Sequence, residues 1–254
     1  MKVSIITASY NSASTITGCI VSVNKQTYKN IEHIIVDGYS KDNTLEIINS
    51  IPNRVSKIIS EPDKGIYDAM NKGIQLATGD VIGILNSDDF FTSDDVITKI
   101  VSVFKTNTID GVYGDICFVN PLNLNKVVRY YSSAWFNPSL FRFGFMPAHP
   151  SFYVRKKCYD EFGLHKIDYK IAADYELLIR YLKVHQLKTH YLNFCVVTMR
   201  TGGYSTRNLK SNWILNKEIV RGCRENGIYT NMMILSLKYI VKITGILFPN
   251  RKKR

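Results

Sequence analysis

The first hundred residues alternate between two hydrophobic periods. Short runs rich in β-branched residues have the length and composition of strands. They occupy residues 3–7, 33–38, 56–62 and 80–85. The intervening segments carry apolar residues at helical spacing, as at Ile66, Met70 and Ile74. Strands of about five residues separated by helices predict βαβ units, and hence an α/β fold with a mainly parallel sheet flanked by helices.

Polar, acid-rich segments follow each of these predicted strands. They are residues 8–11, 37–40, 61–64 and 86–89. Ligands of open α/β sheets bind outside the carboxyl ends of the strands. We therefore expect four independent strand ends to converge on one binding site.

The second half of the chain is less regular. Strands are predicted at residues 111–120, 152–157 and 190–200, and a helix at residues 172–185. No internal repeat or low-complexity linker interrupts the pattern, which favours one compact domain.

Residues 229–254 form a different kind of segment, because their apolar residues run nearly all round a helix, broken by Lys238 and Lys242. No uninterrupted apolar stretch reaches the roughly eighteen residues that a membrane span needs. An apolar face with lysines and the basic end "NRKKR" is typical of an amphipathic helix in a membrane interface. A helix packed on its own domain, or one that mediates a homodimer, is the alternative.

The charge of the 254-residue chain is unevenly distributed. The formal net charge is +12, with 9 basic and 12 acidic residues in 1–100 and 24 and 9 in 101–254. Such asymmetry indicates a polyanionic neighbour, either a nucleic acid or an anionic membrane. The predicted strand ends are acidic and no nucleic-acid-binding motif is present, so we expect no nucleic-acid partner.

The cysteines and the amino terminus indicate the compartment. Five cysteines without C-x-x-C spacing argue against a disulfide framework and a zinc site, and fit a reducing cytoplasm. The opening "MKVSIITASYN" enters a strand at once and lacks the length and cleavage site of a signal peptide. We therefore expect a cytoplasmic protein, peripheral on the inner face of the cell membrane.

Two adjacent carboxylates, Asp88 and Asp89, follow the fourth predicted strand. Like charges side by side raise each other's pKa and cost stability unless a cation neutralises them. Mn²⁺ or Mg²⁺ is a suitable partner, since these ions commonly bridge carboxylates to phosphates. The alternative is a helix-capping role, which Ser93, Asp94 and Asp95 already fill.

Four motifs together resemble one enzyme family. "VSIITASYN", "VDGYSKDNT", "DKGIYDAMNKGIQLATGD" and "ILNSDD" are similar, in order and spacing, to the nucleotide-binding half of family 2 glycosyltransferases. These are inverting enzymes of polysaccharide assembly with the GT-A fold, a Rossmann-like sheet flanked by helices. The resemblance is close over residues 2–105 and looser to about residue 207, through "MPAHPSFYVRKKCYDEFG" and "IAADYELLIRYL".

The resemblance implies a role for each matching position. Asp89 would bind the cation that bridges the two donor phosphates, and Asp88 would approach the ribose and the donor sugar. Asp37 would hydrogen-bond the base, usually uracil in this family, and Tyr10 would offer a ring for stacking. The remaining donor-binding positions are Ala8, Ser9, Lys64, Asp68 and Asn71.

One position departs from the commonest form of the motif, because Asn86 stands where an aspartate is usual. Asparagine keeps an oxygen ligand but removes one charge, which leaves the identity of the metal open. The resemblance implies that Asp174 is the catalytic base, since it lies at the helix N-terminus where this family carries its catalytic carboxylate. The helix dipole favours the ionised form there. A simple capping role for Asp174, and Glu176 as the base, are the alternatives.

Three further residues are candidates for contacts with the acceptor or the diphosphate. His149 lies in "MPAHPSF", where relatives often carry a histidine, and a packing role is its alternative. Tyr204 and Arg207 belong to "GGYSTR", whose glycines would permit a loop to close on the donor.

The resemblance as a whole implies an inverting, metal-dependent glycosyltransferase. Its donor would be a nucleotide-diphosphate sugar, a UDP-sugar in the usual case, and its acceptor a growing, lipid-linked glycan of a cell-surface polysaccharide such as O-antigen or capsule. A polyprenyl-phosphate glycosyltransferase and a non-catalytic nucleotide-sugar-binding relative are the alternatives. The predicted units are a nucleotide-sugar-binding half at 1–105, an acceptor-side half at 106–207, and a membrane-associating tail at 208–254.

Overall fold

A computed structural model describes residues 1–202 and 209–238. In these residues nine strands form one sheet, with the order β3-β2-β1-β4-β8-β6-β9-β5 and with β7 paired to β6. The strands are β1 (Val3–Ser9), β2 (Ile31–Asp37), β3 (Val55–Ser60), β4 (Val81–Ile84), β5 (Phe90–Phe91), β6 (Gly111–Asn120), β7 (Asn123–Tyr131), β8 (Tyr153–Arg155) and β9 (Thr189–Arg200).

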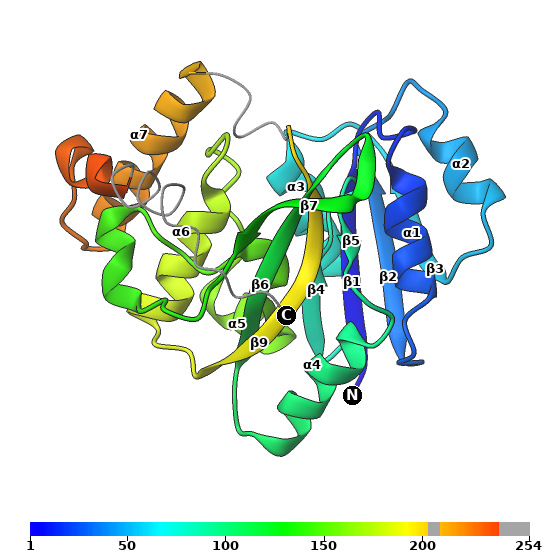
Figure 1. Ribbon diagram of the computed structural model, residues 1–254, viewed down its shortest axis with the longest axis horizontal. Helices are drawn as coiled ribbons and strands as arrows, with labels where there is room; N and C mark the ends of the chain where they lie inside the picture. The colour runs from blue at the N-terminus through cyan, green and yellow to red at the C-terminus, as the bar shows by residue number, and fades with distance from the viewer. Residues whose placement is uncertain (203–208, 239–254) are drawn as a thin grey trace.

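Helices cover both faces of this sheet (Figure 1). They are α1 (Ile16–Asn24), α2 (Thr44–Ser50), α3 (Ile66–Leu76), α4 (Val96–Thr106), α5 (Lys156–Phe162), α6 (Ala173–Ile179) and α7 (Leu209–Glu225). Two 3₁₀ turns, η1 (Pro138–Phe143) and η2 (His149–Ser151), and a π-helical turn, η3 (Arg180–Val184), follow in the second half, and residues 232–238 are also helical.

Alternation along the strands divides the core into two main layers. Ile6 and Ile34 point to the face covered by α3, α5 and α6, whereas Val3 and Ile5 point to the face covered by α1 and α4. A half-buried strand would alternate with polar residues, but these strands are buried on both sides and read as continuous apolar runs.

The predicted parallel sheet is confirmed for the first four strands, β1 to β4. β1 pairs in parallel with β2 and β4, and β2 pairs in parallel with β3. The register places Ser9 beside Asp37 and Asp37 beside Ser60. The carboxyl ends of these strands therefore meet at one edge, as the sequence predicted.

The second half adds features that the sequence pattern did not indicate. β8 inserts antiparallel between β4 and β6, and β6 continues into an exposed hairpin with β7. β8 confirms a strand within the predicted residues 152–157, although residues 156 and 157 already belong to α5, whereas the two residues of β5 are too few for a periodicity to be recognised. Their places are decided by pairing partners far away in the chain.

A buried carboxylate, Glu32, ties the amino-terminal strands together. Its side chain accepts hydrogen bonds from the Ser4 hydroxyl (2.6 Å), the Thr78 amide (2.8 Å) and the Lys2 ammonium (3.1 Å). Burial raises the pKa of Glu32, but these hydrogen bonds outweigh it and lower the pKa to about 2. Glu32 therefore stabilises the fold in its ionised form.

We expect Glu32→Gln to lower the free energy of unfolding at pH 7 by about 2–3 kcal/mol. The folded-state pKa is depressed, so the contribution is complete above about pH 4.5 and is lost as the pH falls towards about 2. Urea denaturation at several pH values measures this difference. The exposed Glu46→Gln is the matched control, and a Glu32→Gln penalty that did not shrink in acid would contradict this account.

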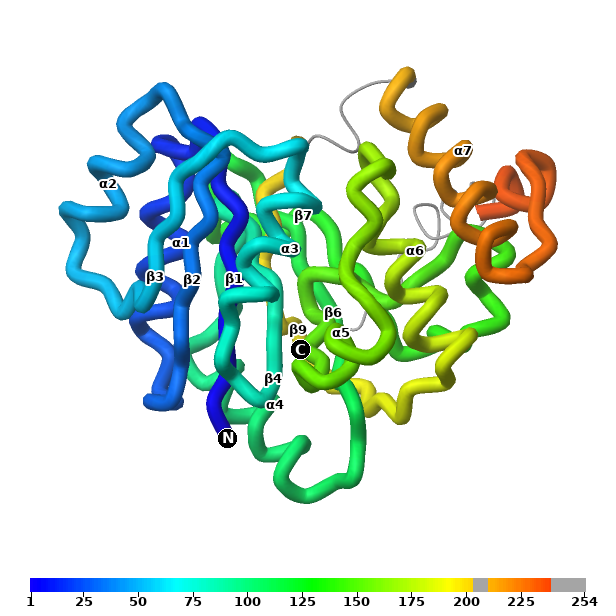
Figure 2. The backbone as a smooth tube through the Cα atoms, turned by 180° about the vertical axis from the view of Figure 1, so that it is seen from behind, coloured from blue at the N-terminus to red at the C-terminus, as the bar shows by residue number. Residues whose placement is uncertain are grey.

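The described part of the predicted tail packs on the rest of the fold. Ile219 and Cys223 of α7 and Leu235 are buried in the same core as α6. Glu218 of α7 accepts hydrogen bonds from three successive backbone amides just before α6, the first from Lys170 at 2.7 Å. Figure 2 shows α6 and α7 side by side at the end of the molecule away from α1 and α2.

These contacts bear on two expectations from the sequence. Residues 209–238 are integrated with the domain, whereas residues 239–254 lie outside the described residues, and the boundary at 207 stays a prediction. Lys238 is buried and donates to Asn216 Oδ1 at 2.6 Å, because the fold turns it inward. Among the described helices, none combines the length and the apolarity that crossing a membrane requires.

Candidate active site

Side-chain hydrogen bonds join the loops that follow β1, β2 and β4. The Ser12 and Ser87 hydroxyls are 2.8 Å apart, which links the loops after β1 and β4. The Asn11 amide donates to Ser40 Oγ at 2.8 Å, which links the loops after β1 and β2, and the Ser12 amide donates to Thr44 Oγ1, at the start of α2, at 2.8 Å. The three loops thus form one bonded surface at the carboxyl edge of the sheet.

The nucleotide positions predicted on β1 and β2 lie on this surface. Ala8 and Ser9 are buried, whereas Tyr10 is 62% exposed and presents its ring to solvent. Asp37 is buried and accepts hydrogen bonds from the Ser40 amide (2.9 Å), the Ser40 hydroxyl and the Ser60 hydroxyl (2.8 Å). The Asp37 carboxylate is thereby held in one orientation.

Asp89 is fully buried at the same edge. Its Oδ2 lies 3.4 Å from Asn86 Nδ2, while Asp89 Oδ1 and Asn86 Oδ1 are buried without a hydrogen-bond partner. Burial and the neighbouring Asp88 raise the pKa of Asp89 well above its ordinary value, against the opposing effects of Asn86 and Arg200. Unpartnered buried oxygens of this kind fit a divalent cation that prefers oxygen ligands.

The protein supplies only part of such a coordination sphere. Across residues 1–202 and 209–238, no three His, Cys, Asp or Glu side chains are grouped so as to hold a metal ion. Asn86 and Asp89 would therefore need further oxygens from a bound phosphate or from water. This fits a cation that enters with its ligand, as Mg²⁺ commonly does.

Arg200 is a neighbour of the acidic pair that the sequence did not reveal. From the end of β9 its guanidinium donates to the Asp88 carbonyl, 112 residues away, and lies 5.2 Å from the Phe90 ring centroid. A Cβ on Gly18 would come 2.9 Å from Arg200 Nη2, so this glycine leaves room for the guanidinium. Arg200 thus places a positive charge beside Asp89 without any metal.

The start of α3 carries the next predicted positions. Lys64 is exposed, and its amide donates to Asp68 Oδ2 at 3.0 Å; Asp68 also pairs with Lys72 at 3.5 Å. Asn71 is buried. Its side-chain Nδ2 donates to the His165 carbonyl (2.8 Å), and its Oδ1 accepts from the His165 backbone amide (3.0 Å). Asn71 therefore anchors a distant loop, and its contact with a donor stays a prediction.

Asp174 lies in the first turn of α6. Its Oδ1 accepts a hydrogen bond from the Tyr175 amide at 2.8 Å and lies 3.4 Å from the Tyr67 hydroxyl of α3. Burial raises the pKa of Asp174, although His149 and these two hydrogen bonds oppose the shift. A raised pKa brings a carboxylate nearer to the range in which a general base is most effective.

Two buried histidines accompany Asp174. The rings of His149 and His165 meet edge to face with centroids 5.7 Å apart, and Tyr67 stacks on His165 at 5.7 Å. Burial lowers the pKa of His149, against the opposing charge of Asp174, and lowers the pKa of His165 further below its ordinary value. Both imidazoles are therefore neutral at pH 7, and sequence reasoning identified only His149.

Glu176 has a different environment from Asp174. Its side chain is fully buried and pairs with Arg180 and Lys166, each at 3.0 Å. Burial raises the pKa of Glu176, but the hydrogen bonds and charges of these partners prevail and lower it. This arrangement favours a structural ion pair over a catalytic base. The other two predicted contacts, Tyr204 and Arg207, lie outside the described residues.

Known proteins share this fold. The crystal structure of S. aureus TarS 1-349 in complex with UDP-GlcNAc superposes with a TM-score of 0.69 at 17% identity, covering 87% of this chain and 66% of that one. The mannosyltransferase PcManGT from Pyrobaculum calidifontis, in complex with GDP-Man and Mn²⁺, gives 0.60 at 16% identity, covering 98% and 82%. This chain spans only 39% of a longer TarS structure.

Sequence comparison identifies the family. A PGL/p-HBAD biosynthesis glycosyltransferase of Mycobacterium bovis is 29% identical over 225 residues, covering 86% of this chain and 82% of the relative. An uncharacterized glycosyltransferase of Mycobacterium tuberculosis is 31% identical over 195 residues, covering 70% and 68%. The model of glycosyl transferase family 2 matches residues 4–158. The chain therefore belongs to glycosyl transferase family 2 and is a glycosyltransferase with a GT-A-type fold.

Proposed function

We propose that this glycosyltransferase moves a sugar, with inversion, from a UDP-sugar to the hydroxyl group of a glycan acceptor. The observation that carries the proposal is the gathering of acidic groups at the carboxyl edge of the parallel sheet. Asp37 is the last residue of β2, Asp89 lies in the loop after β4, and Asp174 contacts Tyr67 in the first turn of α3, the helix that follows β3. Ligands of such sheets bind at this edge.

The donor would lie across the bonded loops. The exposed Tyr10 ring would stack on the base, while Asp37, held by Ser40 and Ser60, would accept a hydrogen bond from the base edge. Asn86 and Asp89 would hold Mn²⁺ or Mg²⁺, which when bound stabilises the negative charge that develops on the departing phosphate. The family and the Mn²⁺ named with PcManGT support this assignment.

The acceptor hydroxyl needs a base on the face of the sugar opposite the leaving phosphate. Asp174 would take its proton, and one carboxylate suffices because an inverting reaction proceeds by a single displacement. The Tyr67 hydroxyl and the Tyr175 amide orient the carboxylate. Because burial lowers the pKa of His149, this neighbouring imidazole is neutral and adds no positive charge beside Asp174. In this arrangement Asp174 is the group that touches the reacting hydroxyl.

We extend the proposal to the acceptor and its location. The acceptor would be a growing, lipid-linked glycan of a cell-surface polysaccharide, handled at the inner face of the cell membrane. The excess of basic residues after residue 100 supports an anionic membrane as the neighbour. The division into halves at residues 105 and 106, and a homodimer through the tail, remain parts of this proposal.

The donor assignment is tested by measuring the melting temperature of the protein in the presence of each member of a panel of nucleotide sugars. TarS was solved with UDP-GlcNAc and PcManGT with GDP-Man, so both nucleotides belong in the panel. We expect UDP-sugars to raise the melting temperature with Mn²⁺ or Mg²⁺ and to lose this effect with a chelator. Stabilisation by GDP-sugars alone would refute the uracil assignment, and stabilisation by no donor would refute the transferase proposal.

A further inference from the structure

An exposed surface on α7, the helix that packs against α6, combines large apolar side chains with cations. It lies on α7 and on the following helical residues 232–238, and we name it the α7 face. Trp213 is 54% exposed, Tyr229 72% and Met233 81%. The residues that form it are Trp213, Lys217, Val220, Arg224, Tyr229, Met232, Met233 and Leu237.

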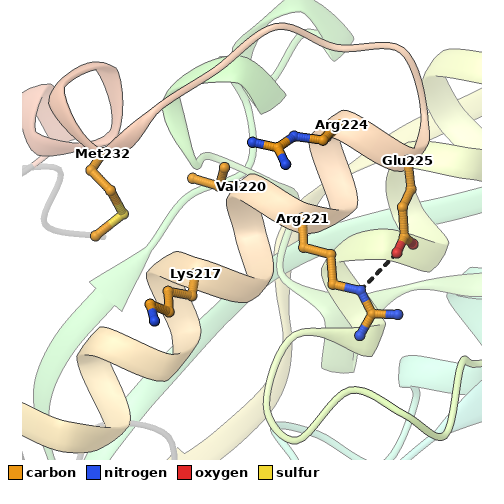
Figure 3. A pocket seen from close by; sticks show the side chains of 6 residues that line it. All are labelled: Lys217, Val220, Arg221, Arg224, Glu225 and Met232. Atoms are coloured by element: carbon orange, nitrogen blue, oxygen red, sulfur yellow. Dashed lines mark hydrogen bonds and ion pairs between the residues drawn. The ribbon is translucent and has the colours of Figure 1, made fainter.

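A groove of about 460 Å³ runs through this face between the two helical segments. Figure 3 shows Val220 and Met232 on opposite walls, with Lys217 and Arg224 on the α7 wall. Lys217 Nζ also lies 3.4 Å from the centroid of the Trp213 ring. Apolar and cationic groups are therefore interleaved along one groove.

Buried contacts on the inward side of this segment keep its apolar residues exposed on the outside. Leu235 and Lys238 are buried on the inward side of residues 232–238, where Lys238 donates to Asn216 Oδ1 at 2.6 Å. The Thr230 hydroxyl donates to the Arg142 carbonyl at 2.5 Å, which fixes the turn before this segment. Because the inward side is anchored, the exposed Met233 cannot turn inward without breaking these contacts.

The charge of the α7 face is positive although one acid, Glu225, lines the groove together with Arg221. Glu218 accepts hydrogen bonds from backbone amides before α6, and Glu225 pairs with Lys166 (2.8 Å) and Arg221 (2.7 Å). In the part of the chain that the structure describes, Arg224 has no acidic partner. The surface thus offers uncompensated cations beside methionine and tryptophan.

We infer that the α7 face docks onto an anionic membrane surface. Cations attract the lipid headgroups, while Trp213, Met232 and Met233 enter the boundary between headgroups and acyl chains. A nucleic acid would match the charge but not the exposed methionines, which favours the bilayer. This inference rests on the proposed function only in that a lipid-linked acceptor would then be presented close to Asp174.

Flotation of the full-length protein with lipid vesicles tests the inference. Vesicles containing phosphatidylglycerol should bind it, and pure phosphatidylcholine vesicles should bind it weakly. Each cation near an anionic surface contributes about fivefold to binding, so Lys217→Gln with Arg224→Gln should weaken binding about 25-fold. Lys25→Gln with Lys29→Gln removes two exposed cations near α1 and should change it about fivefold or less. Equal losses in both variants would overturn the assignment to this face.

Tryptophan fluorescence locates the contact. The chain has two tryptophans, so Trp135→Phe leaves Trp213 as the only reporter. Its emission should shift to shorter wavelength with anionic vesicles, and Met233→Ser should reduce the binding whereas Leu122→Ser, at an exposed hairpin tip, should not. An unshifted Trp213, or a dimer that buries it without lipid, would overturn the inference. UDP-sugar stabilisation in the same variants reports separately on the proposed function.

Discussion

Asp89→Asn is expected to abolish the stabilisation by nucleotide sugar and Mn²⁺ and to lower kcat/KM by about 10²–10³-fold. The substitution keeps the volume of the side chain but removes the charge that would hold the cation. The metal-free protein should melt at the same or a higher temperature, because Asp89 is a fully buried carboxylate with an unpartnered Oδ1. Calorimetry of Mn²⁺ and donor binding, together with thermal denaturation, measures both effects.

The control for this variant is Asp94→Asn, an identical change at an exposed position five residues further along the chain. It should leave donor binding, metal dependence and stability unchanged. If Asp89→Asn retained chelator-sensitive donor binding, the cation would have to be held elsewhere. If it lowered the melting temperature of the metal-free protein, Asp89 would be a structural residue.

Asp174→Asn is expected to leave donor binding intact and to lower the transfer rate about 10²–10⁴-fold, the usual contribution of a general base. The asparagine can still accept from the Tyr175 amide, so α6 should keep its first turn. Because burial raises the pKa of Asp174, the acid limb of the pH profile of kcat/KM should lie above the ordinary aspartate value of 3.8. Single-turnover kinetics and donor titration separate the two effects.

Two variants set the limits of this interpretation. Asp160→Asn breaks an exposed pair with Lys156 and should be nearly silent. Glu176→Gln should lower the melting temperature, because it leaves Arg180 and Lys166 without their buried partner. Full transfer activity in Asp174→Asn, with loss only in a stable Glu176→Gln, would reverse the assignment of the base.

The positions of the residues on the proposed donor side could be predicted because their signals are local. A run such as residues 80–85 predicts a strand by itself, and the acids that follow it must then lie at the strand end. The order and spacing of the motifs indicated the family, and the comparison with the family model confirms it. Even so, the metal ligands and the base remain proposals, because a residue type in a pattern does not show what binds to it.

The residues of the proposed acceptor side are brought together by contacts between distant segments. The loop that carries His165 is held by Asn71, 94 residues earlier, and no periodicity records such a pair. Arg200 reaches Asp88 across 112 residues only because β9 pairs with β5. Their partners are selected by packing and burial after the sheet has formed.

The sequence by itself determined the parallel α/β half of this protein and the placement of its acids at the strand ends. The reason is that local patterns decide whether a segment is a helix or a strand, and strands that alternate with helices run parallel. Only the tertiary structure decided which groups surround those acids. It placed a cation, Arg200, beside Asp89, buried Lys238, and left Met233 exposed on the outside of the same segment. The reason is physical: burial and pairing depend on which surfaces meet in space, and a linear pattern does not specify that.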